Sequence, residues 1–234
     1  MTLIKTQDKK AFSIECKTAT RAEIAIYSSI GDSMWDDSVS AKSFNQELTG
    51  LPSSVNQIDV RLNSGGGDVF DGMTIYNRLK QHKAKVTVYI DGLAASIASV
   101  IALAGDEIVM GEGALMMIHK PWTMAQGDSK DLEETIDRLN DVEEQILGIY
   151  ERNTNLSRPE LRKMIAETTW FDADQAIDMG FAQRKMASDE SVDMAASLNN
   201  AFWIKDKPQL ASGQEMVNNK INEFRNNVKD FLAR

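Results

Sequence analysis

Apolar and polar positions alternate along the first half of the chain, and helical spacings follow the alternating runs. Residues 22–27 alternate and predict a strand, and the runs 57–63 and 85–90 predict two more. Each of the two later runs is followed by a predicted helix, one that ends near His82 and one of small residues over 95–104. Strands that alternate with helices predict an α/β fold with a mainly parallel sheet and helices on its faces.

Three shorter elements complete this part of the pattern. The spacing of Phe44 and Leu48 predicts a helix over 40–48. The apolar runs 107–110 and 114–119 predict two short strands. They extend the same sheet after the second helix.

A long amphipathic helix is predicted over 128–153. Its apolar positions are separated by four, three, three, four and three residues, which places them on one face. The other face is acidic, because residues 128–144 hold eight acidic and two basic side chains, a net of −6 out of −9 for the whole chain. Contacts made through this face are therefore expected to depend on salt. The apolar positions are Leu132, Ile136, Leu139, Val142, Ile146 and Ile149.

Helix-start and helix-stop signals mark two further helices. Ser157 begins a capping box that contains a proline, and the helix it starts ends near Glu167. Asp172 is the predicted N-cap of the next helix, and Gly180 is its predicted end. A short strand over 181–184 closes this part of the chain.

The pattern divides the chain into three parts. Residues 1–20 are a polar N-terminal lead, 21–186 form one domain, and 187–234 form a tail. The tail begins as a polar linker and ends in a short amphipathic helix with heptad spacing. Such a helix is too short to be stable alone, so we expect it to bind a partner surface. Its apolar positions are Val217, Ile221, Phe224, Val228 and Phe231.

Composition removes several classes of function. A net charge of −9 does not predict a nucleic-acid partner. A single cysteine, Cys16, excludes an intramolecular disulfide framework, and with two histidines the chain has few ways to build a metal site, so we expect neither a metal nor another cofactor. Residues 1–10 lack the apolar core of a secretory signal, and no apolar run is long enough to span a membrane. The expected setting is the cytoplasm.

The first candidate site is a glycine run in residues 62–68, between a predicted strand and a predicted helix. Such a run can form a tight turn, or it can present backbone N–H groups to an anion or to the oxyanion of a reaction intermediate. It lacks the Lys-Ser/Thr ending of a P-loop. The residues alone leave the turn and the oxyanion hole open.

The second candidate site is Ser96, which lies among small residues at the start of the next predicted helix. It can be a simple N-cap, or its accessible hydroxyl can act as a nucleophile at the positive end of the helix dipole. Ser99, one turn later, is expected to pack or to bond within its own helix.

The third candidate site is His119, at the end of the predicted strand 114–119. A histidine in this position can be purely structural. If the protein uses a general base near neutral pH, His119 is preferred over His82, because His82 lies at a helix C-terminus where a solvated role is sufficient. A serine nucleophile needs such a base.

These three sites together carry a resemblance. The segments 63–67 (NSGGG), 92–96 (GLAAS) and 117–121 (MIHKP), in this order and spacing, resemble the Clp protease proteolytic subunit family, and most of all its phage-borne members used in head maturation. The resemblance covers about residues 20–186. It implies the fold shared with crotonases, with repeated ββα units and a protruding handle helix at about 128–152.

The resemblance also implies a function and its residues. It implies a serine endopeptidase in which Ser96 is the nucleophile, His119 is the general base, and the backbone N–H groups of Gly67 and Ile97 form the oxyanion hole. The family usually has a proline where Gly65 stands. It further implies homo-oligomeric rings stacked through the handle helix.

The third member of the triad stays open between two residues. Counting back from Gly180 without a gap places the aspartate of the family on Thr168, whereas phage members often have a glutamate before a Thr-Trp pair, which favours Glu167. Trp122 and Met124 are expected to line the substrate site, and an extended substrate is expected to pair with the strand before them.

Three functions are compatible with these residues. The leading hypothesis is a phage head maturation protease that cleaves capsid or scaffold proteins, with the C-terminal helix binding one of them. The second is a catalytically weak assembly or scaffolding protein on the same fold. The third is an acyl-CoA enzyme of the crotonase type.

Overall fold

The computed structural model describes residues 12–32 and 38–187. The chain forms two compact units, Met1–Ala201 and Phe202–Arg234, and the second lies outside the described residues. The predicted C-terminal helix and most of the predicted linker therefore also lie outside them. Everything below concerns the first unit.

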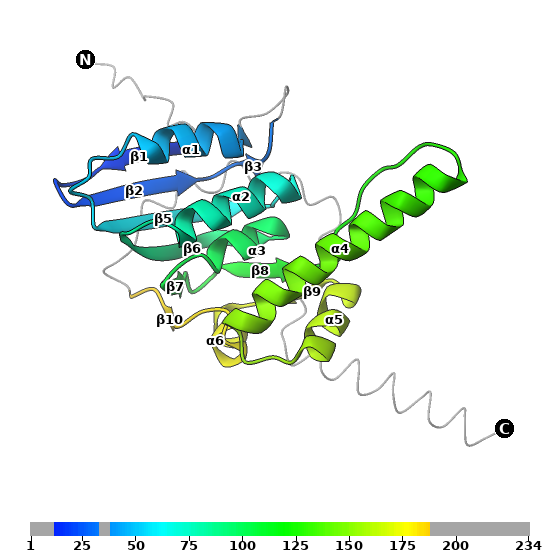
Figure 1. The fold of residues 1–234 in the computed structure, drawn as a ribbon. Helices are drawn as coiled ribbons and strands as arrows, with labels where there is room; N and C mark the ends of the chain where they lie inside the picture. Colours follow the sequence, from blue (N-terminus) through cyan, green and yellow to red (C-terminus); the bar gives the residue numbers. More distant parts are fainter. Residues whose placement is uncertain (1–11, 33–37, 188–234) are drawn as a thin grey trace, which may run out of the picture. The chain divides into compact units, whose positions relative to one another are not determined.

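The described part of the first unit is an eight-stranded sheet with six helices, as the α/β prediction required (Figure 1). The strands run in the order β1-β2-β5-β6-β7-β10, and β8 pairs with β6 and with β9. All pairs are parallel except β1 with β2 and β8 with β9. The strands are β1 (Phe12–Cys16), β2 (Arg21–Ile26), β5 (Gln57–Ser64), β6 (Lys85–Ala95), β7 (Glu107–Met110), β8 (Leu115–Ile118), β9 (Thr169–Phe171) and β10 (Arg184–Lys185), with β3 (Ser29–Ile30) and β4 (Ser38–Val39) pairing separately.

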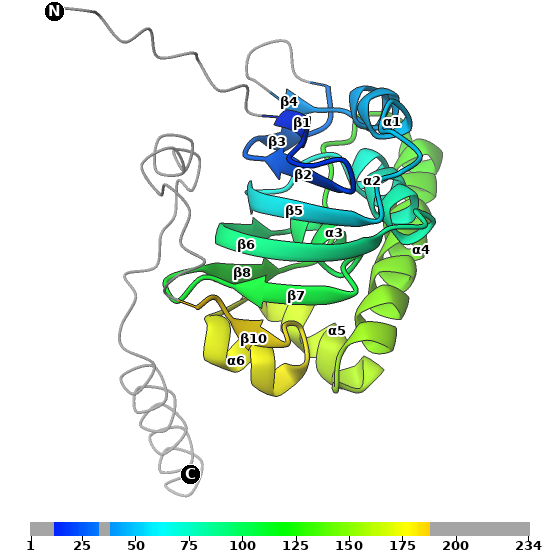
Figure 2. The same cartoon turned by 90° about the vertical axis from the view of Figure 1, so that its left-hand side faces the viewer.

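Helices α1, α2 and α4 lie on the same side of this sheet (Figure 2). The core lies between these helices and the sheet. Its side chains are at most 1% exposed and include Ile58, Val60 and Leu62 of β5 and Ile75 and Leu79 of α2. All six residues of α3 are buried. The helices are α1 (Ala41–Thr49), α2 (Val69–Lys80), α3 (Ile97–Ala102), α4 (Ser129–Asn153), α5 (Arg158–Glu167) and α6 (Ala173–Met179).

Strand β6 is longer than expected and delivers the candidate nucleophile. The sequence predicted a turn after Ile90, but the strand continues to Ala95. Its first part pairs with β7, and its last part, from Leu93 to Ala95, pairs with β8. The prediction was wrong because small residues over 91–95 resemble a turn, and only the partner strand β8 makes them a strand.

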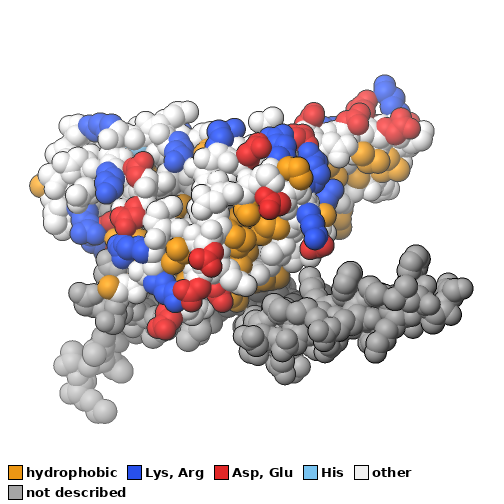
Figure 3. Space-filling model, turned by 90° about the horizontal axis from the view of Figure 1, so that it is seen from below, with side chains coloured by type: hydrophobic (Ala, Val, Ile, Leu, Met, Phe, Trp, Pro, Cys, Tyr) orange, Lys and Arg blue, Asp and Glu red, His pale blue; other side chains and the backbone are white. Residues whose placement is uncertain are grey.

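The handle helix is α4, and its first half extends beyond the sheet (Figure 1). Asp128 caps it with a capping box that the sequence analysis did not single out. Leu132 and Ile136 are 41% and 56% exposed, whereas Ile146 and Ile149 near the other end are 5% exposed. Figure 3 shows apolar, acidic and basic side chains together on the projecting end of this helix.

The acidic face of α4 is partly neutralised within the chain. Glu143 accepts from Arg162 at 2.9 Å and pairs with Lys120 at 3.1 Å. Glu144 pairs with Arg158 at 2.7 Å and with Arg162 at 2.6 Å. Because these cations lie outside 128–144, the sequence count overstated the charge that α4 offers to another molecule.

Further differences from the sequence predictions concern β1, β10 and α3, which spans Ile97–Ala102 instead of the predicted 95–104. Strand β1 lies inside the segment interpreted as a patternless lead and pairs antiparallel with β2. The closing strand β10 begins at Arg184, not at Phe181, because the Phe181 ring is buried against Tyr150 and Phe171, with centroids 5.6 and 4.8 Å away.

Candidate active site

Ser96 occupies the junction between β6 and α3 in an uncommon backbone conformation. Its φ is 57° and its ψ is −129°, a strained region for a residue with a side chain. Its N–H donates to the carbonyl of Met117 on β8 at 2.9 Å, and its carbonyl accepts from the N–H of Ser99 at 3.0 Å. Ser96 occupies the N-cap position of α3, but its side chain accepts no hydrogen bond from the backbone of that helix.

His119 lies directly after β8 and contacts the candidate nucleophile. Its Nε2 is 2.7 Å from Ser96 Oγ. The β6–β8 register, which pairs Ala95 with Met117, brings the ends of the two strands to the same place. Burial lowers the pKa of His119 from its usual 6.5, which favours the neutral imidazole that a base requires.

The glycine run forms a turn that is held by hydrogen bonds to Ser28 and Ile30. Ser64 Oγ donates to the carbonyl of Ser28 at 2.6 Å and accepts the Gly66 N–H at 3.1 Å. The N–H of Ile30 donates to the Gly66 carbonyl, and its own carbonyl accepts the N–H of Asp68, both at 2.9 Å. These two bonds to Ile30 involve Gly66 and Asp68, the residues on either side of Gly67. The Gly67 N–H therefore points away from Ile30.

The turn lies against the nucleophile. A Cβ on Gly66 would stand 2.7 Å from the Ser96 Cβ and 2.7 Å from the carbonyl oxygen of Ala95. The N–H of Ile97, at the first position of α3, has no acceptor within its helix. The N–H of Ile97 is thus left for an outside acceptor beside Ser96, and its pairing with the Gly67 N–H in an oxyanion hole stays a prediction.

Gly67→Ala is expected to lower kcat about 10²-fold, which is the usual cost of losing one oxyanion donor. Its φ is 146°, and a Cβ there would stand 2.0 Å from the Ile30 carbonyl oxygen, so the turn must move. Gly65→Ala is the matched control, because a Cβ there has nothing within 4 Å and its φ is not positive. Steady-state peptide hydrolysis measures both; equal rates for the two variants would show that this turn has no catalytic role.

Neither candidate for the third triad position is joined to His119 by a hydrogen bond in the structure. Thr168 ends α5 in the left-handed region with a φ of 54°. Since β8 and β9 pair Ile118 with Thr169, one further step of the register places Thr168 across from His119. Over residues 12–32 and 38–187 no carboxylate is bonded to His119, and burial is the one cause of its lowered pKa. Thr168 and Glu167 both stay predictions.

The predicted substrate residues lie in the segment that follows His119. Trp122 is 71% exposed and Met124 is 90% exposed. Phe70, on the first turn of α2 after the glycine run, is 70% exposed and was not singled out in the sequence. The sequence does hold a signal for an exposed apolar side chain here, because Phe70 lies two positions after Asp68, the N-cap of α2.

A buried ion pair joins β5 to β6, the strand that leads to the nucleophile. The guanidinium of Arg61 forms an ion pair with Asp91, and Tyr27 donates its hydroxyl proton to Asp91 at 2.6 Å. Burial raises the pKa of Asp91. These contacts join β5 and β6 to the residue that follows β2, and sequence reasoning, which treated Asp91 as part of a turn, missed them.

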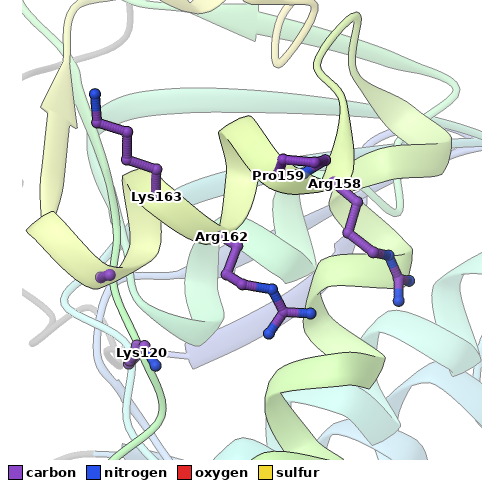
Figure 4. Close-up of a pocket in the computed structure, with 6 residues that line it drawn as sticks. Lys120, Arg158, Pro159, Arg162 and Lys163 are labelled. Carbon is purple, nitrogen blue, oxygen red and sulfur yellow. The ribbon is translucent and has the colours of Figure 1, made fainter.

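An open surface pocket of about 650 Å³ lies between α5 and Lys120, the residue after His119 (Figure 4). Arg158 and Arg162 on its wall point toward the ribbon of α4, whereas Lys163 points away (Figure 4), and both arginines form ion pairs with acids of α4. The two arginines are therefore engaged in the ion pairs that join α5 to α4. The lining residues are Lys120, Arg158, Pro159, Arg162, Lys163 and Ala166.

The described residues contain no group of three or more His, Cys, Asp or Glu side chains that could hold a metal ion. Within the same ranges no helix is long and apolar enough to cross a membrane.

Comparison with known proteins shows which proteins this chain is similar to. The family model of the Clp protease matches residues 7–189. The chain is 29% identical over 196 residues to the ATP-dependent Clp protease proteolytic subunit 1 of Protochlamydia amoebophila, covering 80% of this chain and 94% of that protein. It is 32% identical over 123 residues to the subunit 1 of Chlamydia abortus, covering 51% of this chain and 64% of that protein. A Deinococcus radiodurans proteolytic subunit is 26% identical over 126 residues, covering 53% and 62%.

Proposed function

Because the chain belongs to the Clp protease family, we propose that it is a serine endopeptidase with Ser96 as its nucleophile and His119 as its general base. The observation that carries the proposal is the 2.7 Å contact between Ser96 Oγ and His119 Nε2. Such a contact between a hydroxyl and a neutral imidazole is what activates a serine.

The reaction follows from the groups around Ser96. Nε2 of His119 takes the hydroxyl proton as Oγ attacks the substrate carbonyl carbon, and the N–H groups of Gly67 and Ile97 stabilise the resulting oxyanion. His119 then gives the proton to the leaving amine, and the peptide C–N bond breaks to leave an acyl-enzyme. A water molecule, deprotonated by His119, attacks the acyl group and releases Ser96.

The proposed substrates are capsid or scaffold proteins in an assembling phage head, in the host cytoplasm. The support is the resemblance of the segments 63–67, 92–96 and 117–121 to phage-borne members of the family. The substrate is proposed to bind extended beside β8, with Trp122 and Met124 against its side chains.

The active form is proposed to be a homo-oligomeric ring, with rings stacked through α4. The exposed Leu132 and Ile136 on the projecting half of α4 support this, because two apolar side chains at this exposure gain by packing on another copy. Stacking through α4 is expected to strengthen with salt, because salt screens the repulsion between two acidic helices. The effect should be smaller than a charge of −6 suggests, since Glu143 and Glu144 are already paired within the chain.

A second candidate function, an assembly protein with weak or no catalysis, rests on one observation. His119 has no carboxylate bonded to it among the described residues. Unchanged head assembly after replacement of both Ser96 and His119 would favour this second function over the peptidase.

Labelling with a fluorophosphonate at varied pH tests the peptidase proposal. We expect covalent modification of Ser96 at a rate that rises with pH to a plateau, because only neutral His119 can accept the hydroxyl proton. Burial lowers the pKa of His119, so the midpoint should lie below 6.5. Mass spectrometry of the labelled peptide measures the rate.

The control for this profile is His82→Asn. His82 is the second histidine, and burial lowers its pKa too. Its replacement should leave the midpoint unchanged. Absence of labelling at neutral pH would overturn the proposed peptidase, and a midpoint that moves with His82→Asn would overturn the assignment of the base.

A further inference from the structure

A buried chain of hydroxyl groups joins α4 to the turn that carries Ser96. Tyr150 on α4 is 1% exposed, and Ser99 on α3 is 0% exposed. Ser99 Oγ is 2.7 Å from the Tyr150 hydroxyl and 2.5 Å from the carbonyl oxygen of Ser96. Since the single proton of Ser99 goes to that carbonyl, the Tyr150 hydroxyl must donate to Ser99.

This chain ends on the peptide that carries one of the proposed oxyanion donors. The Ser96 carbonyl and the Ile97 N–H belong to the same planar, trans peptide group, so they point in opposite directions. The carbonyl accepts two bonds from Ser99, one from its N–H at 3.0 Å and one from its hydroxyl at 2.5 Å. Holding the carbonyl toward Ser99 therefore directs the Ile97 N–H away from it.

The peptide needs such restraint because Ser96 has a positive φ of 57°. A residue with a side chain persists in this region only where surrounding contacts hold it there. The Tyr150 ring is itself fixed, since it packs edge-on against Phe181 with centroids 5.6 Å apart. The hydroxyl of Tyr150 is thus delivered from a rigid position.

We propose that Tyr150 and Ser99 are positioning residues that direct the Ile97 N–H toward the oxyanion. Neither side chain is exposed to a substrate, so both act through the Ser96–Ile97 peptide. The proposal rests on the proposed peptidase function. It adds that α4, which carries the exposed Leu132 and Ile136, is joined to the catalytic turn by one defined hydrogen-bond chain.

Kinetics of Tyr150→Phe, Ser99→Ala and the double variant test the proposal. A misdirected donor costs less than a lost one, so each single change should lower kcat about tenfold and leave KM unchanged. Affinity for a peptide boronate, which mimics the tetrahedral intermediate, should fall by the same factor. The double variant should lose no more than Ser99→Ala, because Tyr150 acts through Ser99.

The matched control is Tyr76→Phe, which removes the hydroxyl of another buried tyrosine outside this chain. It should leave kcat and boronate affinity unchanged. Multiplying losses in the double variant, a rise in KM at constant kcat, or unchanged boronate affinity would each overturn the proposal. Thermal unfolding of each variant confirms that the comparison is made between folded proteins.

Crystal structures of the wild type and of Ser99→Ala separate this proposal from the proposed function. We expect the Ser96–Ile97 peptide to rotate in Ser99→Ala. If the wild type neither labels nor hydrolyses peptides, the peptidase proposal fails, and the peptide orientation still decides whether Ser99 positions it. An unchanged orientation overturns the positioning proposal.

Discussion

Replacing Ser96 with alanine is expected to lower kcat about 10⁶-fold, the loss that removal of the nucleophile causes in serine peptidases. The physical reason is that Oγ is the one atom of the site placed to form the acyl-enzyme, 2.7 Å from the base that activates it. The residual rate should be that of direct attack by water on the substrate carbonyl, with the oxyanion hole still stabilising the intermediate.

His119→Ala should cost nearly as much, and the double variant little more, because the two groups act as a unit. Mass-resolved digestion of a candidate capsid or scaffold protein measures cleavage, and the same spectra show whether the tail, residues 187–234, is removed by self-cleavage. Ser53→Ala, a change at an exposed serine before β5, is the matched control and should retain full activity. Hydrolysis that survives in Ser96→Ala would assign the activity to other residues.

Local signals predicted the helix ends well. Ser157 and Asp172 begin their helices with the predicted capping bonds, and Gly180 ends α6 with a φ of 85°. These features depend on residues within four positions of one another, so they can be predicted from the local sequence.

Features that depend on distant partners were not predictable in this way. Ser99 was expected to bond within its own helix, and it does reach the Ser96 carbonyl, but its second partner, Tyr150, lies 51 residues away. Strand β6 extends to Ala95 because β8 pairs with it, and nothing in the local pattern signals that partner. The same holds for Glu143, whose cations come from outside the acidic segment.

The candidate site shows both cases together. The sequence motifs placed Ser96 and His119 on separate turns, and only the β6–β8 pairing shows that they meet. The third position could not be settled by counting, because Thr168 lies in the left-handed region at the end of α5, where the register of β9 breaks off.

The left-handed backbone conformation of Thr168 is the basis of the second prediction with a large effect on kcat. Threonine is strained there because of its branched Cβ, whereas aspartate is among the residues that tolerate this region. One step beyond the Ile118–Thr169 pair, position 168 lies across from His119. Nε2 of His119 contacts Ser96, so Nδ1 is the nitrogen that a carboxylate at position 168 would engage.

Thr168→Asp is therefore expected to raise kcat about 10³-fold, within the 10⁴-fold that loss of the triad acid costs in a serine peptidase. The carboxylate would orient His119 and stabilise the imidazolium that forms during attack. It would also raise the pKa of His119, because a negative charge favours the protonated ring, so the acid limb of the pH–rate profile should move to higher pH.

Two variants separate charge from shape and test the competing assignment. Thr168→Asn relaxes the backbone without adding charge, so it should raise the unfolding temperature but leave the pH profile in place. Glu167→Gln should have little effect if Glu167 takes no part. A 10⁴-fold loss in Glu167→Gln, with no gain in Thr168→Asp, would instead identify Glu167 as the acid that moves to His119 in the assembled enzyme.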